Sequence, residues 1–431
     1  MTFRLAGSGW VVGATCAIVL TGACTSLLGS FEEEPAIAVT STSGTGSATS
    51  SVAMGSGGTD QGGAGGMGSA TSSVTTGSGG GGIPPILFAA PVNYGAGTKP
   101  WSVTAGDWNS DKKLDLAVVN GNSSNVSILL SNGNGTFQAK VDYGVGLNPV
   151  SVTAGDWSGD GKPDLAVANQ FSGNVSILLG NGNGTFQAKV DYGAGAGPTS
   201  VTAGDWNADK KLDLAVANDG NGNVSILLGN GNGTFQAKVD YGTGSYPASV
   251  TAGDWNGDGK PDLAVANGVK DISVNVSILL GNGNGTFLPK VDYGAGAGPT
   301  SVTAGDWNGD GKPDLAVANQ FSGSVSILLG NGNGTFQAKV DYATGKLSKS
   351  VMAGDWNGDE KADLAVANYA SDNVSVLLGN GNGTFLPKVD YAAGVGSYAV
   401  TAGDWNGDGK ADLAVANGNS SNVSILLNTS Q

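Results

Sequence analysis

Hydrophobic and polar residues follow one pattern that recurs from residue 86 to the end of the chain. The motif Gly-Asp-Trp marks each recurrence, with a spacing of 49 residues and one step of 52. A fixed period near 50 residues is typical of solenoids, propellers and repeat arrays. Residues 86–431 therefore divide into seven repeats. Their motif aspartates are Asp107, Asp156, Asp205, Asp254, Asp306, Asp355 and Asp404.

Each repeat predicts four β-strands and shows no helical periodicity. In residues 151–199 the apolar segments read SVTAGD, DLAVAN, NVSILL and FQAKVDY, and turns rich in asparagine and glycine separate them. From Phe186 to Tyr192 apolar and polar residues alternate, so we expect an outer strand with one buried face, which includes Val190. Four strands in about 50 residues are typical of a β-propeller blade.

The two ends of the repeated region predict how a propeller closes. The seventh repeat stops at VSILLNTSQ and lacks its last strand, which ILFAAPVNYGAG at residues 86–97 supplies. Phe88 then aligns with Phe186, and Tyr94 with Tyr192. We therefore predict an all-β fold: a seven-bladed β-propeller of four-stranded blades, closed when the N-terminal strand pairs in the C-terminal blade. An open solenoid would not need this exchange.

The N-terminal residues predict export. Arg4 precedes an apolar run that is short for a transmembrane helix, which favours a secretory signal at residues 1–24. Small residues before Cys24 resemble a bacterial lipobox, which implies lipidation of Cys24; a plain cleaved signal peptide is the alternative. Residues 25–84 are rich in Gly, Ser and Thr and predict a disordered, flexible linker before a propeller at 85–431. We expect an exported lipoprotein at the outer membrane or cell surface.

Composition excludes several kinds of function. The chain has no histidine, and both of its cysteines lie in the first 24 residues, so a Ser-His-Asp triad and a His- or Cys-ligated metal site are excluded from the repeats. The net charge is −15, which disfavours nucleic acid and anionic membrane surfaces as partners. We expect membrane contact through the lipid anchor only, and a monomeric propeller.

A nine-residue loop that begins at the motif aspartate carries the candidate chemistry. Oxygen-bearing side chains stand at its positions 1, 3, 5 and 9, and hard oxygen ligands suit Ca²⁺; position 7 would add a backbone carbonyl. Seven Ca²⁺ ions would bring 14 positive charges to a net charge of −15, so we predict up to seven structural Ca²⁺ ions. The predicted ligands are Asp107, Asn109, Asp111, Asp115, Asp156, Ser158, Asp160, Asp164, Asp205, Asn207, Asp209, Asp213, Asp254, Asn256, Asp258, Asp262, Asp306, Asn308, Asp310, Asp314, Asp355, Asn357, Asp359, Asp363, Asp404, Asn406, Asp408 and Asp412.

The seven loops differ at position 6. Four copies have glycine there, whereas Lys112, Lys210 and Glu360 stand in the other three. We expect a positive φ angle at this position, which favours glycine. A lysine also places a cation near the metal, so the loops at Asp107 and Asp205 should bind Ca²⁺ most weakly.

The repeat GDWNGDGKPDLAVAN…GNGNGTF resembles the FG-GAP (VCBS-type) repeat of integrin α-chain propellers and of many bacterial secreted proteins. The resemblance covers residues 86–431. It implies a seven-bladed propeller with Ca²⁺ on one face and adhesion or ligand binding on the opposite face. Some relatives of this fold are lectins and a few are enzymes.

The repeats themselves distinguish two faces. The nine-residue loops and the GNGNGTF turns are nearly identical among repeats, whereas the other two connections vary, and strand order places these on the opposite face. Exposed aromatic residues on loops bind sugars or protein partners, although loop drift without a ligand is the alternative. The candidate ligand residues are Trp101, Phe171, Tyr246, Phe321, Tyr369 and Tyr398. The tryptophan after each motif aspartate is expected to pack between blades.

We therefore expect a membrane-tethered, calcium-stabilised propeller that acts as a non-catalytic adhesion or ligand-binding module. Its ligand would be a protein or a glycan on the variable face. A calcium-dependent lectin is the alternative, and a purely structural protein or a propeller-based polysaccharide lyase are further ones. A lyase needs a general base, and no repeat shows a unique cluster of candidate groups, so we expect no enzyme.

Overall fold

The computed structural model describes residues 88–268 and 274–430. The predicted signal peptide, the linker and Cys24 lie outside these residues. Among the described residues, no helix is long and apolar enough to cross a membrane.

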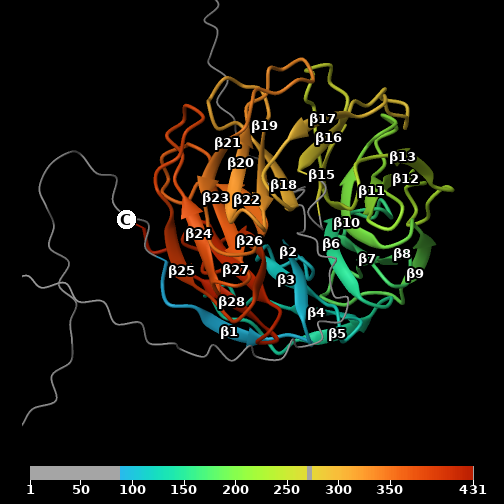
Figure 1. The fold of residues 1–431 in the computed structure, drawn as a ribbon. Helices are drawn as coiled ribbons and strands as arrows, with labels where there is room; N and C mark the ends of the chain where they lie inside the picture. The colour runs from blue at the N-terminus through green and yellow to red at the C-terminus, as the bar shows by residue number, and fades with distance from the viewer. Residues whose placement is uncertain (1–87, 269–273, 431) are drawn as a thin grey trace, which may run out of the picture. The chain divides into compact units, whose positions relative to one another are not determined.

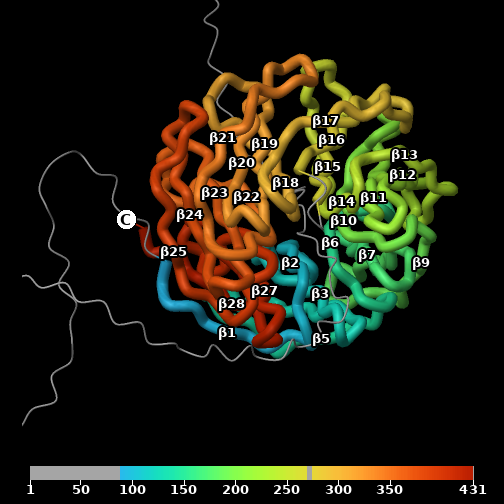
Figure 2. Tube along the Cα trace, in the orientation of Figure 1, coloured from blue at the N-terminus to red at the C-terminus, as the bar shows by residue number. Residues whose placement is uncertain are grey.

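Seven four-stranded antiparallel sheets follow one another around a ring in chain order (Figures 1 and 2). We name them blades A to G. The innermost strands of A to G are β2 (Pro100–Gly106), β6 (Pro149–Gly155), β10 (Pro198–Gly204), β14 (Pro247–Gly253), β18 (Pro299–Gly305), β22 (Ser348–Gly354) and β26 (Ser397–Gly403). The second strands are β3 (Asp115–Asn120), β7 (Asp164–Asn169), β11 (Asp213–Asn218), β15 (Asp262–Asn267), β19 (Asp314–Asn319), β23 (Asp363–Asn368) and β27 (Asp412–Asn417).

The outer half of each blade completes this order. The third strands are β4 (Asn125–Leu129), β8 (Asn174–Leu178), β12 (Asn223–Leu227), β16 (Asn275–Leu279), β20 (Ser324–Leu328), β24 (Asn373–Leu377) and β28 (Asn422–Leu426). The outermost strands of A to F are β5 (Val141–Gly144), β9 (Val190–Gly193), β13 (Val239–Gly242), β17 (Val291–Gly294), β21 (Val340–Ala343) and β25 (Val389–Ala392), and that of G is β1 (Val92–Gly95).

The predicted closure is confirmed. In blade G the strand order is β1-β28-β27-β26, and Figure 1 shows the blue β1 beside the red β28. Val92 pairs with Ile425 and Gly95 with Asn422, while Phe88 forms an isolated bridge to Asn428. The first strand of the propeller therefore holds the last blade, so backbone hydrogen bonds join the two ends of the repeated region.

The core lies between the blades. Every residue of the second strands is buried, and the apolar ones contact the strands of the neighbouring blade. The tryptophans after the motif aspartates are at most 1% exposed, as predicted, and Trp108 of blade A lies edge-on to Phe186 of blade B at a centroid distance of 5.9 Å. Gly106 is required here, because a Cβ atom on it would lie 2.5 Å from the Trp108 ring.

The outermost strands differ from the prediction. They span four residues, and Val190 is 53% exposed instead of buried. Neighbouring blades diverge with distance from the ring axis, so the outer edge of each blade is only partly covered. Tyr192 still lies against Phe235 of the next blade at a centroid distance of 5.1 Å.

Candidate functional site

The strand order gives the propeller two different faces. The nine-residue loops and the GNGNGT turns connect strands at one face, which we call the repeat-loop face. The connections from the second to the third strand, and from one blade to the next, lie at the other face, which we call the variable face. Phe88, where the described chain begins, bridges Asn428 at the repeat-loop face.

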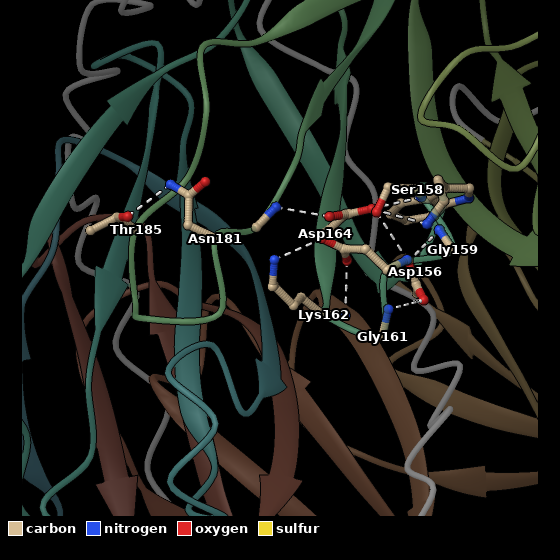
Figure 3. Close-up of polar contacts among 11 residues, drawn as sticks. Asp156, Ser158, Gly159, Gly161, Lys162, Asp164, Asn181 and Thr185 are labelled. Atoms are coloured by element: carbon tan, nitrogen blue, oxygen red, sulfur yellow. Dashed lines mark hydrogen bonds and ion pairs between the residues drawn. The ribbon is translucent and has the colours of Figure 1, made fainter.

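Hydrogen bonds from its own backbone wind the nine-residue loop around its first aspartate (Figure 3). In blade B, Oδ1 of Asp156 accepts from the backbone N–H of Gly159 at 2.7 Å, and its Oδ2 accepts from Gly161 at 2.8 Å. The Ser158 hydroxyl also donates to Asp156 Oδ1, at 3.2 Å. The first aspartate thus orders the loop, and the residues at positions 1 and 3 lie together.

The ninth residue joins the loop to the neighbouring turn. Asp164 is fully buried; its Oδ2 accepts from Trp157 N at 3.0 Å and its Oδ1 from Gly180 N at 2.8 Å (Figure 3). Burial raises the pKa of Asp164 to about 6, and the nearby charge of Asp156 acts in the same direction. The other six blades repeat this arrangement, and in blade F the pKa of Asp363 reaches about 7.

The fifth residue pairs with lysine. Asp160 Oδ2 accepts from Lys162 Nζ at 2.9 Å, and this hydrogen bond lowers the pKa of Asp160. Across residues 88–268 and 274–430, no three carboxylates lie close enough together to hold a metal ion. The donor types therefore suit a hard cation, but the side chains as they lie do not close around one.

The expected backbone conformation at position 6 is confirmed in every loop. Its φ angle is 66° at Lys112, 64° at Lys210 and 63° at Glu360, and it is also positive at the four glycines. Position 4 has a positive φ angle as well, at 62° for Ser110 and 60° for Ala208. The positive φ angle at position 4 was not predicted, although five of the seven loops have glycine there, which indicates it.

The two faces carry very different charge. The seven loops hold 22 acidic residues against nine lysines. The described connections of the variable face hold only four charged residues, two of each sign: Lys99, Lys346, Asp219 and Asp372. Most of the net negative charge of the chain therefore lies at the repeat-loop face.

The variable face holds the predicted aromatic residues, but two of the six are not exposed. Trp101 and Tyr398 are 8% and 4% exposed and stack on each other, with centroids 5.8 Å apart and an interplanar angle of 14°. Each is the second residue of an innermost strand, where the seven strands converge, so bulky side chains there cover each other. The prediction of exposed ligand-binding rings is wrong for Trp101 and Tyr398.

The other four aromatic residues remain accessible. Phe171 and Phe321 are 72% and 48% exposed, and Tyr246 and Tyr369 are half-buried. Three exposed aliphatic residues of this face were not predicted, Leu147, Val274 and Val395, because no periodicity marks single apolar residues in loops.

Solved propellers share the fold at low sequence identity. BBS1N, solved in complex with ARL6DN, is 16% identical with a TM-score of 0.56, over 79% of this chain and 96% of that chain. A streptogramin B lyase structure is 14% identical with a TM-score of 0.56, over 79% of this chain and 98% of that one. Hydrazine synthase of Kuenenia stuttgartiensis is 16% identical with a TM-score of 0.52, over 73% of this chain and 92% of that one. These likenesses show the fold alone.

Comparison by sequence gives the family. No curated protein matches the chain. The FG-GAP-like repeat profile matches six times, at residues 107–167, 156–216, 205–265, 266–317, 306–366 and 355–415. These matches cover most of the propeller and contain the nine-residue loops described above. The chain belongs to the FG-GAP-like repeat family.

Proposed function

We propose that the protein is a non-catalytic binding module whose ligand contacts the variable face. The observation that carries this proposal is the location of exposed apolar side chains. Some of the exposed apolar side chains among the described residues belong to the outer rim: the first valine of each outermost strand, and Leu288. The others occur singly, and all lie on the variable face: Leu147, Phe171, Val274, Phe321 and Val395. Exposed apolar and aromatic residues on loops are typical of interaction sites.

The topology supports this choice of face. The described chain enters the propeller at Phe88, at the repeat-loop face. A connection to Cys24 would therefore join the propeller at the face opposite to the variable loops and would leave the variable face free of the attachment point. Palmitate labelling of the wild type, and its loss in Cys24→Ala, tests the anchor.

We further propose that the nine-residue loops bind Ca²⁺ and thereby stabilise the propeller. The residues at positions 1, 3 and 5 would hold the ion, which supplies positive charge to a strongly acidic face. Their oxygen donors support the assignment, and so does the tightly wound loop, in which the residues at positions 1 and 3 lie together.

The binding proposal is tested with the full chain on a glycan array and against displayed random peptides, in millimolar Ca²⁺ and in EDTA. We expect the protein to bind at least one glycan or peptide. The double variant Phe171→Ser/Phe321→Ser should lose this binding, whereas Val190→Ser, at a similarly exposed residue of an outermost strand, should retain it. If the folded protein binds neither a glycan nor a peptide, the proposal is contradicted. Equal loss in Val190→Ser would contradict the choice of face.

A further inference from the structure

Two residues form the tip of each blade on the variable face, and one backbone hydrogen bond joins them. In blade B the N–H of Phe171 donates to the carbonyl of Leu147 at 3.2 Å. Both residues are described in every blade except D, and all of them are exposed. We call them the tip pairs: Thr98/Asn122 in A, Leu147/Phe171 in B, Ala196/Gly220 in C, Ala297/Phe321 in E, Lys346/Ala370 in F and Val395/Asn419 in G.

The tip pairs carry almost no charge. Lys346 is their only charged member among the described residues, and the variable-face connections as a whole balance two lysines against two aspartates. The loops of the repeat-loop face hold 22 acidic residues against nine lysines. Two copies of the chain that approach through their repeat-loop faces therefore repel each other, whereas two variable faces can meet without this repulsion.

The tips also differ in size in a way that suits contact with a second copy. Blade B has the largest pair, with Leu147 61% and Phe171 72% exposed. The neighbouring blade C has the smallest pair, Ala196 and Gly220. A face that bears both large apolar tips and small ones can be complementary to itself, as a two-fold symmetric interface requires.

The order of the blades defines how such an interface is arranged. Two identical rings that meet face to face are related by a two-fold axis between them. In a ring of seven blades this axis passes through one blade and between the two opposite blades. An axis through blade F places B opposite C, G opposite E and A opposite D. The large tips of B then meet the small tips of C, and Val395 of G meets Phe321 of E.

Blade F lies opposite its own copy in this arrangement, and it carries two opposite charges. Lys346 and Asp372 are both exposed, and the backbone N–H of Lys346 donates to Ser371 Oγ at 2.9 Å, beside Asp372. Asp372 Oδ1 accepts from the backbone N–H of Gly396 at 2.7 Å. No ion pair within the described residues includes either side chain. Around the two-fold axis, Lys346 of each copy lies opposite Asp372 of the other.

We propose that the variable face binds a second copy of this chain, head to head, about a two-fold axis through blade F. Apolar tips of blades B, E and G pack against the facing copy, and two ion pairs between Lys346 and Asp372 fix the register. This inference goes beyond the proposed function, since a ligand of the variable face competes with the second copy. It replaces the expectation of a monomer, which did not consider the paired tips.

Sedimentation velocity of the full chain over a range of concentrations tests the self-association. We expect monomers and dimers in a concentration-dependent equilibrium. Lys346→Glu should raise the dissociation constant at least about tenfold, because it sets two acids against each other. Lys346→Glu/Asp372→Lys should restore the dimer. Lys210→Glu is the matched control, since it changes the net charge equally at the repeat-loop face, where blade F already has Glu360.

Chemical crosslinking tests the position of the axis. Single cysteines are introduced after Cys16→Ser and Cys24→Ser, which remove both native cysteines. Ala370→Cys, in the tip pair of blade F, lies near the axis and should crosslink to its own copy with a short bismaleimide. Ala297→Cys is the control, because it is an exposed tip residue of blade E, which faces blade G. Equal crosslinking of both variants overturns the axis through blade F.

Other outcomes separate this inference from the proposed function. A monomer at every concentration overturns the inference, while the binding of glycans or peptides is judged by its own test. A dimer that Lys346→Glu leaves unchanged, or that Lys210→Glu weakens equally, overturns it as well, and so does association that continues beyond the dimer. Phe171→Ser is the second variant if Lys346→Glu does not melt as the wild type does, and it should weaken the dimer.

Discussion

The side-chain amide of Asn428 donates a hydrogen bond of 2.9 Å to the main-chain carbonyl of Trp356 in the neighbouring blade. At the other six interfaces, the carbonyl of the equivalent tryptophan accepts from a backbone glycine N–H of the GNGNGT turn, as between Gly184 and Trp108 at 2.8 Å. In blade G the outermost strand is β1, from the start of the repeated region, so among the described residues no such turn joins it to β28. Asn428 thus replaces a missing backbone donor with a side-chain donor.

Asn428→Ala should destabilise the propeller by about 1–2 kcal/mol. The substitution leaves the buried carbonyl of Trp356 without this donor, and an unsatisfied buried polar group costs about 1–3 kcal/mol. Urea unfolding of the full chain measures the effect. Gln138→Ala, at an exposed residue beside a turn, is the control and should change little; an unchanged midpoint for Asn428→Ala would contradict the role of this contact.

Ala399→Ser should stabilise the propeller by about 0.5–1 kcal/mol. At six of the seven interfaces a serine Oγ of one innermost strand accepts from a valine N–H of the next, as between Ser350 and Val400 at 3.4 Å. Blade G has Ala399 at this position, opposite Val103 of blade A. Thermal unfolding compares Ala399→Ser with Ser350→Ala, which should lose a similar amount. A lower melting temperature for Ala399→Ser would refute the expectation.

Ser110→Gly and Lys112→Gly should each stabilise the loop of blade A by about 0.5–1 kcal/mol, because glycine adopts a positive φ angle without steric cost. Blade D supplies the reverse control, since Gly257→Ser and Gly259→Lys introduce the residues of blade A at the same positions and should destabilise. Chemical denaturation in EDTA measures both pairs without any contribution from a metal. Effects of the same sign in both pairs would be inconsistent with strain at these positions.

Calcium should raise the melting temperature, and EDTA should lower it. At tenfold excess over its dissociation constant, each filled loop contributes about 1.4 kcal/mol, so several loops together shift the transition by many degrees. Loops with lysine at position 6, at Asp107 and Asp205, should fill last in a titration followed by calorimetry. A shift of only a few degrees, or simultaneous filling of all loops, would argue against the assignment.

Without metal, the stability should rise as the pH falls from 7 to 5. The ninth aspartates have a pKa of about 6 in the folded chain, above the unfolded value of about 3.9. The folded state therefore takes up protons first, and this contribution is complete below about pH 4 and lost as the pH rises through about 6. Urea midpoints at pH 5 and 7 in EDTA measure the trend, and Asp164→Asn should reduce it. A midpoint that falls on acidification would contradict the raised pKa.

Several features of the fold could be predicted because each repeat contains them in full. The strand segments, the inter-blade tryptophans and the positive φ angle at position 6 all recur at fixed positions. The pairing of β1 with β28 could also be predicted, because the segment missing from the last repeat stands at the start of the first. In each case the feature depends on residues within one repeat, and comparison with the other repeats reveals it.

The sequence by itself determined the number of blades, the order of strands and the separation of a constant from a variable face. Tertiary structure alone decided which side chains of these faces are exposed. Trp101 and Tyr398 are buried because the innermost strands converge at the ring axis, whereas Val190 is exposed because the blades diverge at the rim. Likewise, Lys349 meets Gln320, which stands 29 residues earlier, only because consecutive blades lie side by side. Distance from the ring axis and contacts between blades arise when the ring closes, and no pattern within one repeat encodes them.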